Sequence, residues 1–322
     1  GNFSISINLT QDAANTLSVT AADSVNNESS AATVLITEDS TAPNAPAITT
    51  EPQIINASSL LIVGTAEANA SIEITGGAAT ASGTASGTGN YLISVLLIQD
   101  ATSTLSITAR DAAGNVSSSS VIVIVEDSTP PVVTILGDNP AIVEVGSEYV
   151  DAGATANDTV AGDLTNQIAT SSNVNTGVLG TYSIIYTVAD TVENETSETR
   201  IVNVVDTTDP VVSLVGSSIV THEAGTPYAD AGATAADNYD GNISASIVAT
   251  STVNVNIIGD YEVRYNVVDS SGNSSPEELI RTVSVRDTIA PVITLIGDVT
   301  VTTEFGLPYE DAGATVSESF DP

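Results

Sequence analysis

Apolar residues occupy every second position along several short stretches of the chain. Tyr182, Ile184, Tyr186 and Val188 show this spacing, and residues 261–267 repeat it as YEVRYNV. A period of two residues gives a strand one buried face and one face in water. Val, Ile and Thr, which pleated surfaces favour, are abundant, and no segment has a convincing helical period. Short strands between turn signals predict an all-β chain built from β-sandwiches.

The same patterns return at long intervals. Residues 1–40 align with residues 89–128 without a gap, at an offset of 88 positions. A second motif, Y-x-D-A-G-A-T, begins at Tyr149, Tyr228 and Tyr309, at spacings of 79 and 81. Repeats of this length are whole small domains, because solenoid units have about 20–50 residues. The chain is therefore expected to be a row of similar domains.

One acidic linker recurs between the repeats, with an Asp four residues before its closing Pro. These Asp residues are Asp39, Asp127, Asp206 and Asp287. The linkers predict a partial domain at 1–39, complete domains at 40–127 (domain 1), 128–206 (domain 2) and 207–287 (domain 3), and a partial domain at 288–322. Proline restricts such short linkers, which favours an extended, semi-rigid rod. Both ends fall inside repeats, so we expect the chain to be a slice of a longer array.

The composition excludes several classes of function. The chain has no Cys, so disulfides and thiolate metal sites are impossible. All five of its Lys and Arg residues are Arg. A net charge of −35 argues against nucleic acid and anionic membranes as partners. No apolar run reaches the roughly 18 residues that membrane insertion requires. Such a charge opposes compaction unless divalent cations or a very salty habitat screen it.

A short acidic motif precedes each linker by about 16–18 residues. It reads DAAGN from Asp111 and DSSGN from Asp269, with looser copies from Asp23 and Asp190. Its place between two strands predicts a hairpin turn, and Gly or Asn at its fourth position suits the left-handed backbone of that turn. Glu193 occupies this position in domain 2, where we expect strain or a different turn.

The motifs resemble two families of bacterial immunoglobulin-like (Ig-like, or Big) domains of large surface adhesins. The sequence VGTAE at 63–67, followed by DAAGN at 111–115, is similar to one family. The segments from Asp151 and Asp230 are similar to a second family with the motif Y-x-D-x-G-A-x-A-x-D-x-x-D-G. The resemblance implies tandem Ig-like β-sandwiches in repetitive stalks of adhesins or biofilm proteins. These stalks lie outside the bacterial cell and are often stiffened by calcium.

In an Ig-like sandwich, the linker before a domain lies at the end that also holds the loop between its second and third strands (BC loop) and its late hairpin turn (FG turn). Ca²⁺ takes six to eight oxygen ligands, which acidic residues from three such segments could supply. The candidate ligands are Asp39, Asp111, Asn115, Asp127, Asp158, Asp163, Asp190, Asn194, Asp206, Asp209, Asp237, Asp240, Asp269, Asn273, Asp287 and Asp321. The alternative is that Asp and Asn occur there only because turns favour them.

The BC loops predict unequal sites. Domain 3 has DNYDG at 237–241, whereas domain 2 has DTVAG at 158–162 and lacks two of these oxygen-bearing side chains. Asp163 compensates only in part. The junction before domain 3 is therefore predicted to bind Ca²⁺ more tightly than the junction before domain 2.

No motif favours catalysis. His222, the only histidine, lies in an expected strand without a nucleophile-elbow motif, so we predict that the chain is not an enzyme. The leading hypothesis is an extracellular stalk or spacer at the bacterial cell surface, whose partners are neighbouring Ig-like domains of the same chain. A subunit of a surface layer or filament, with other copies as partners, is the first alternative. A carbohydrate-binding accessory module is the second, and the absence of Trp counts against it.

Overall fold

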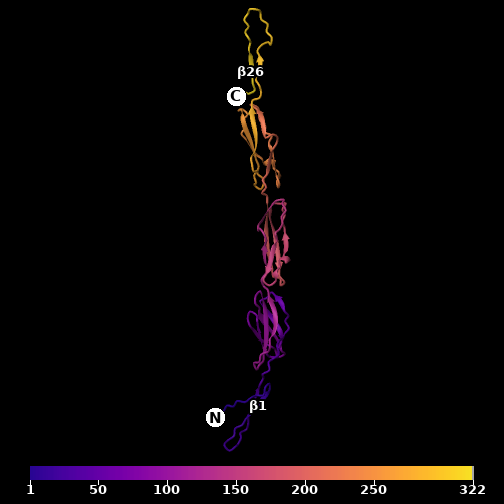
Figure 1. Ribbon diagram of the computed structural model, residues 1–322, viewed down its shortest axis with the longest axis vertical. Coiled ribbons are helices and arrows are strands. Elements are labelled where there is room, and N and C mark those ends of the chain that lie inside the picture. The colour runs from indigo at the N-terminus through magenta and orange to yellow at the C-terminus, as the bar shows by residue number, and fades with distance from the viewer. Residues whose placement is uncertain (321–322) are drawn as a thin grey trace. The chain divides into compact units, whose positions relative to one another are not determined.

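The computed structural model describes residues 1–320 as a succession of β-strands joined by turns (Figure 1). Its only helical elements within this range are two single 3₁₀ turns, η1 (Thr165–Gln167) and η2 (Ser244–Ser246). The prediction of an all-β chain is therefore confirmed. Asp321, one of the predicted ligands, lies outside the described residues.

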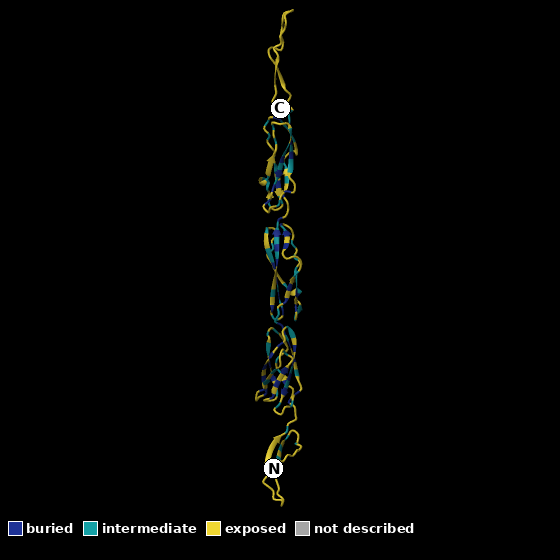
Figure 2. Ribbon diagram, turned by 90° about the vertical axis from the view of Figure 1, so that its left-hand side faces the viewer, coloured by how far each residue is buried: buried dark blue, intermediate teal, exposed yellow. Residues whose placement is uncertain are grey.

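The chain divides into two compact units. The first comprises residues 1–139, 151–172 and 183–200, and the second holds the remaining described residues. Domain 1 thus belongs to the first unit and domain 3 to the second, while the residues of domain 2 are shared between them. Buried residues are concentrated in the predicted complete domains (Figure 2), whereas the strands of residues 1–39 and 288–320 are largely exposed.

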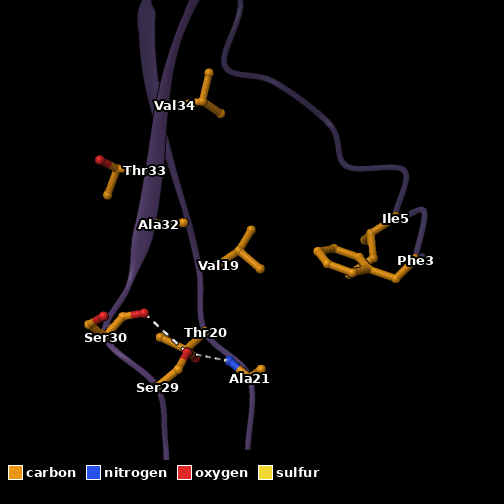
Figure 3. Close-up of a pocket in the computed structure, with 10 residues that line it drawn as sticks. All are labelled: Phe3, Ile5, Val19, Thr20, Ala21, Ser29, Ser30, Ala32, Thr33 and Val34. Carbon is orange, nitrogen blue, oxygen red and sulfur yellow. Dashed lines mark hydrogen bonds between the residues drawn. The ribbon is translucent and has the colours of Figure 1, made fainter. Parts of the chain in front are cut away.

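The first unit begins with one hairpin, β1 (Ala14–Val19) paired antiparallel with β2 (Ala32–Thr37). An open hollow of about 630 Å³ lies beside it, where Phe3 and Ile5 face Val19 and Val34 (Figure 3). Phe3 is 72% exposed, but Tyr91, its counterpart 88 positions later, is only 3% exposed. The hollow is therefore an uncovered copy of a domain core, and we do not assign it a ligand.

Domain 1 contains two sheets. The first has the order β3 (Ala47–Ile48), β5 (Ser59–Thr65), β8 (Asn90–Leu96). The second has the order β4 (Gln53–Ile55), β10 (Ser120–Glu126), β9 (Ala101–Arg110), β6 (Ser71–Thr75), β7 (Ala81–Thr84). Alternate residues of both sheets, such as Ile62, Ile72 and Leu105, are fully buried in one cluster. Two sheets with a shared core form a sandwich.

The first unit also holds one part of domain 2. A sheet with the order β11 (Val132–Ile135), β13 (Ala154–Asp158), β14 (Gly162–Asp163) lies here. β15 (Ala169–Ser172) pairs antiparallel with residues 184–187 of β16 (Gly180–Ala189). These strands place the ends of β13 and β16, which matter for the candidate site below.

The second unit contains the other part of domain 2 and all of domain 3. β12 (Ala141–Glu144) pairs parallel with residues 202–205 of β17 (Glu195–Val205). One sheet of domain 3 is β18 (Val211–Leu214), β20 (Ala233–Asp237), β21 (Gly241–Asn242). The other is β19 (Ile219–Glu223), β24 (Leu279–Arg286), β23 (Gly259–Asn266), β22 (Val248–Ser251). The unit ends with the pair β25 (Val292–Leu295) and β26 (Ala314–Ser317).

The Asp of the Y-x-D-A-G-A-T motif pairs with a buried arginine. In domain 3, Arg281 is 1% exposed, and its guanidinium donates to Asp230 and to the carbonyl oxygens of Val215 and Gly232. The hydroxyl of Tyr265 also donates to Asp230. Domain 2 repeats the arrangement with Arg200, Asp151 and Tyr186. The motif is thus explained by packing, because a buried cation requires a partner.

The backbone at Glu193 is strained, as the sequence predicted. Glu193 has φ = 68°, the left-handed conformation that Gly114 (φ = 102°) and Gly272 (φ = 97°) take at the same place in the other turns. A residue with a Cβ pays roughly 1–2 kcal/mol there, whereas glycine does not.

We expect Glu193→Gly to stabilise domain 2 by about 1 kcal/mol, after allowing for the greater freedom of glycine in the unfolded chain. For a domain of this size the melting temperature should rise by roughly 4–8 °C, as measured by calorimetry in chelator. Glu195→Gly is the matched control. Glu195 begins the strand β17, where glycine should lower the stability of domain 2. A fall in melting temperature for Glu193→Gly would show that the turn is unstrained.

Candidate metal centre

Two groups of three aspartates bring their carboxylates together. Asp127 follows β10, Asp158 ends β13 and Asp190 follows β16, and one ligand atom of each lies within 4.8 Å of the others. Each aspartate comes from a different location, namely the linker, the BC loop and the FG turn. We call this set the first junction, because it joins the linker after domain 1 to the loops of domain 2.

The second group repeats the arrangement at the junction before domain 3. Asp206 follows β17, Asp237 ends β20 and Asp269 lies in the turn after β23, again with one ligand atom of each within 4.8 Å of the others. We call this set the second junction. Both junctions thus combine residues that the sequence analysis had assigned to the linker, the BC loop and the FG turn.

Backbone hydrogen bonds hold the FG-turn aspartates in place. At the first junction, Asp190 Oδ1 accepts from the amides of Val192 (2.8 Å) and Asn194 (3.0 Å). At the second, Asp269 Oδ1 accepts from the amides of Gly272 (2.7 Å) and Asn273 (2.8 Å). These bonds are the ordinary reason for aspartate in a turn. They also fix the direction in which each carboxylate points, so a turn role and a ligand role are compatible here.

The asparagine at the end of each turn ties the linker to the following domain. Asn194 Nδ2 donates to the carbonyl oxygen of Asp127 (3.1 Å), and Asn273 Nδ2 donates to that of Asp206 (3.1 Å). Asn115 makes the same 3.1 Å bond to Asp39 before domain 1. Only the amide nitrogen of each asparagine is used in these bonds, and its side-chain oxygen stays a predicted ligand. Their contribution is to hold the linker aspartate beside the loops.

Asp127 is a buried aspartate whose carboxylate has no partner. It is 1% exposed, and neither of its carboxylate oxygens has a hydrogen-bond partner. Its pKa is raised to about 6, first by burial and then by the charges of Asp158 and Asp190, with smaller effects from Asp100 and Glu126. A buried carboxylate without a partner is costly, and a bound cation removes that cost.

The second junction has fewer unpartnered oxygens. Asp237 Oδ2 is buried and has no partner. The oxygens of Asp206, in contrast, accept from the hydroxyl of Ser271 (3.0 Å) and from the amide of Thr208 (3.2 Å). Burial raises the pKa of Asp206, and these hydrogen bonds oppose the rise. Both junctions therefore concentrate negative charge, but the linker aspartate is fully unpartnered only at the first.

Several predicted ligands lie outside both groups. Asp163 accepts from the amide of Thr165 (2.9 Å), and Asp240 accepts from the amide and hydroxyl of Ser270 (both 2.7 Å). Within residues 1–320, Asp39, Asp111, Asp209 and Asp287 also lie outside the two groups. Asp240 is not one of the three aspartates of the second junction, and tighter binding there stays a prediction.

The sequence analysis missed two further acidic residues beside the linkers. Asp100 lies next to the first junction and Glu144 next to the second, where each binds the residues that follow the linker aspartate. A signal for Glu144 was present, since Glu223 and Glu304 stand at the same place in the next two repeats, each followed by a residue and then by Gly.

Comparison with known families identifies the domains. A model described as "Bacterial Ig domain" matches residues 42–127, and one described as "Bacterial surface protein, Ig-like domain" matches residues 133–204 and 212–285. The chain is a tandem series of bacterial Ig-like domains. The resemblance stated from the sequence motifs is thereby confirmed. Ig-like domain families are generally non-catalytic, and the second family is one of bacterial surface proteins.

Curated relatives share these domains over part of their length. Hyalin of Strongylocentrotus purpuratus is 33% identical over 219 residues, which cover 64% of this chain and 18% of hyalin. Hyalin of Lytechinus variegatus is 32% identical over 219 residues, covering 62% of this chain and 40% of that protein. The chain therefore spans less than half the length of these two relatives.

Solved structures that the chain matches include an adhesin and a fragment of an ectodomain. A Ca²⁺-stabilised adhesin that helps an Antarctic bacterium bind ice has 16% identity and a TM-score of 0.29, covering 84% of this chain and 80% of its own. The ICAM-5 D1–D4 fragment has 13% identity and a TM-score of 0.42, covering 78% and 79%. In the described part of the chain, no helix is long and apolar enough to cross a membrane.

Proposed function

We propose that this chain is a non-catalytic extracellular spacer of a bacterial surface adhesin, stiffened by Ca²⁺ at its first and second junctions. The observation that supports this most is Asp127, whose two buried oxygens have no partner and lie in a group of three carboxylates. The linker supplies one carboxylate of each group and the following domain supplies two. A cation bound there would join the linker to that domain.

The donor set favours a hard cation. Each group offers carboxylate oxygens, and the chain contains no thiol. Carboxylates with nearby backbone carbonyls suit Ca²⁺, which accepts six to eight oxygens in a flexible arrangement, whereas Mg²⁺ demands a near-ideal octahedron. When bound, the cation would offset the repulsion among three carboxylates. The residues that would hold it are Asp127, Asp158 and Asp190 at the first junction, with their counterparts at the second.

The proposed mechanism is geometric. If the linker and the loops of the next domain share a cation, the angle between neighbouring domains is restricted, and a row of such domains holds a distal part of the protein away from the cell surface. The extended rod remains a prediction, and each domain would add on the order of 35 Å, from strands of about 10 residues at 3.3 Å each.

Ca²⁺ should stabilise the chain and narrow the distribution of angles between its domains. At 100 times Kd, a cation that binds only the folded junction stabilises it by about 2.7 kcal/mol. We expect a higher melting temperature in Ca²⁺ than in chelator, unchanged strand content, and a narrower distribution of angles between domains in electron micrographs of single molecules. The double variant Asp127→Asn, Asp206→Asn should have the same melting temperature and the same angle distribution with Ca²⁺ as in chelator. Identical melting temperatures and angle distributions with and without Ca²⁺ would refute the proposal.

A further inference from the structure

A carboxylate of domain 1 holds the residues that follow Asp127 in the linker. Asp100 Oδ1 accepts from the amides of Ser128 and Thr129 (both 3.1 Å), and Asp100 Oδ2 accepts from the Thr129 hydroxyl (2.6 Å). The amide of Asp100 itself donates to Glu126 (2.7 Å). The linker is therefore bound to domain 1 immediately after its candidate metal ligand.

A different residue makes the same contact at the second junction. Glu144, at the end of β12, accepts from the amide of Thr207 (3.0 Å to Oε2), from the hydroxyl of Thr207 (2.6 Å) and from the hydroxyl of Thr208 (2.7 Å). These bonds hold the pKa of Glu144 down, at about 2. Thr207 and Thr208 directly follow Asp206, just as Ser128 and Thr129 follow Asp127.

The contact recurs at the two remaining linkers. Asp12 accepts from the amide of Ser40 (2.8 Å), and Glu223 accepts from the amide (3.2 Å) and the hydroxyl (2.5 Å) of Thr288. We call Asp12, Asp100, Glu144 and Glu223 the anchor carboxylates. In each case the group belongs to the domain before the linker and binds the residue that follows the linker aspartate.

The two repeat types build this contact from unrelated positions. Asp12 and Asp100 lie in a loop before a strand and have left-handed backbones (φ = 51° and 49°), whereas Glu144 and Glu223 end strands. A left-handed aspartate is a sparsely populated conformation that the surrounding structure must maintain. The same contact is therefore made by an Asp in a loop in one repeat type and by a Glu at the end of a strand in the other. This indicates that the junction requires the contact, whichever segment supplies the carboxylate.

We propose that Asp100 and Glu144 are positioning residues, which fix the linker so that Asp127 and Asp206 present their carboxylates to the loops of the next domain. The inference rests on the proposed function. Each linker aspartate is then held on both sides, by the anchor carboxylate on the preceding domain and by Asn194 or Asn273 on the following domain. Bonds from amides and hydroxyls to a carboxylate are charge-assisted and strong, so the linker half on the preceding domain stays ordered without metal. A ligand ordered in advance loses less freedom when the cation binds.

Glu144→Ala in the full chain tests this proposal through two measurements. In chelator, the amide of Thr207 should exchange its hydrogen at least ten times faster than in the unaltered chain. The Ca²⁺ affinity of the second junction should fall by roughly 10–100-fold, as for other residues that orient metal ligands, while the first junction stays unchanged. Glu148→Ala is the matched control, because Glu148 is an exposed glutamate four residues away, and it should change neither quantity.

A second variant guards against a folding defect. Thr208→Val keeps the β-branched shape and removes only one hydroxyl donor to Glu144, and it should produce a smaller change in the same direction. Unchanged exchange at Thr207 in Glu144→Ala, or faster exchange with unaltered Ca²⁺ affinity, would overturn the positioning role. Absence of Ca²⁺ binding in the unaltered chain would instead refute the proposed function, so the two failures are distinguishable.

Discussion

Asp127→Asn is expected to abolish Ca²⁺ binding at the first junction and to leave the second junction intact. Both carboxylate oxygens of Asp127 are buried and unpartnered, so the charge of this residue is available to a cation alone. Asparagine keeps the shape but supplies one neutral oxygen. We expect at least a 100-fold loss of affinity, about 2.7 kcal/mol, in calorimetric titration of the full chain.

The same variant should reverse its effect on stability when the metal is removed. In chelator, Asp127 is a buried charge beside two other carboxylates, and removing an uncompensated buried charge is stabilising. The introduced side-chain amide can also donate to Asp158 or Asp190. Asp127→Asn should therefore melt higher than the unaltered chain in chelator and lower in saturating Ca²⁺.

Asp163→Asn is the matched control for this reversal of melting temperatures between chelator and Ca²⁺. Asp163 was predicted as a ligand of the same junction, but it is exposed and binds the amide of Thr165. Its variant should preserve Ca²⁺ binding and show no reversal. If Asp127→Asn binds Ca²⁺ as tightly as the unaltered chain, Asp127 is not a ligand.

Asp230→Ala should destabilise domain 3 by about 3–5 kcal/mol, the cost of leaving a buried charge without its partner. Arg281 is 1% exposed, and Asp230 is its only ionic partner among the described residues. Tyr265 and the carbonyl oxygens of Ser217, Val215 and Gly232 remain near the guanidinium, so the lower end of this range is the expected value. Thermal unfolding followed by calorimetry in chelator measures the effect without interference from the junctions.

Glu278→Ala supplies the comparison, since it breaks an ion pair with Arg264 in which both side chains are more than one third exposed. Such exposed pairs contribute about 0–1 kcal/mol, so the variant should be nearly neutral. If Asp230→Ala and Glu278→Ala cost the same, the buried arginine is not stabilised by its aspartate.

The contact between Asp230 and Arg281 also makes the stability of domain 3 depend on pH. Burial acts to raise the pKa of Asp230, but hydrogen bonds from Tyr265 and Arg281 outweigh it and hold the pKa below 3.8. A carboxylate with a depressed pKa in the folded state contributes stability above its unfolded pKa and loses it as the pH falls through the folded value. The unaltered chain should therefore lose stability below about pH 4, and Asp230→Ala should lose less.

The alternation of apolar residues was sufficient to predict the strands. Successive side chains of a strand point to opposite faces, so the pattern depends only on neighbouring residues. The repeats and the linkers predicted domain bounds, but not the ends of individual strands. The arginine cores could not be predicted in this way. Arg281 reaches Asp230 across 51 residues, and nothing in the spacing shows that an arginine points inward.

The candidate site was predictable to the level of segments but not of atoms. Asp237 and Asp240 stand three residues apart in one loop, yet Asp237 joins the carboxylate group and Asp240 binds Ser270. The sequence shows which loops are acidic. The direction of each carboxylate depends on the backbone amides within hydrogen-bond distance of it, which the sequence does not show. The contact between Glu144 and Thr207 was missed for another reason, because it joins segments 63 residues apart.

The central claim is that the first and second junctions are calcium sites. The most direct test is calorimetric titration of the full chain with Ca²⁺, together with Asp127→Asn and Asp206→Asn. We expect two ions per chain, with each variant losing one of them, because only these two junctions gather three carboxylates within the described residues. No bound Ca²⁺, or two ions still bound in both variants, would contradict the account.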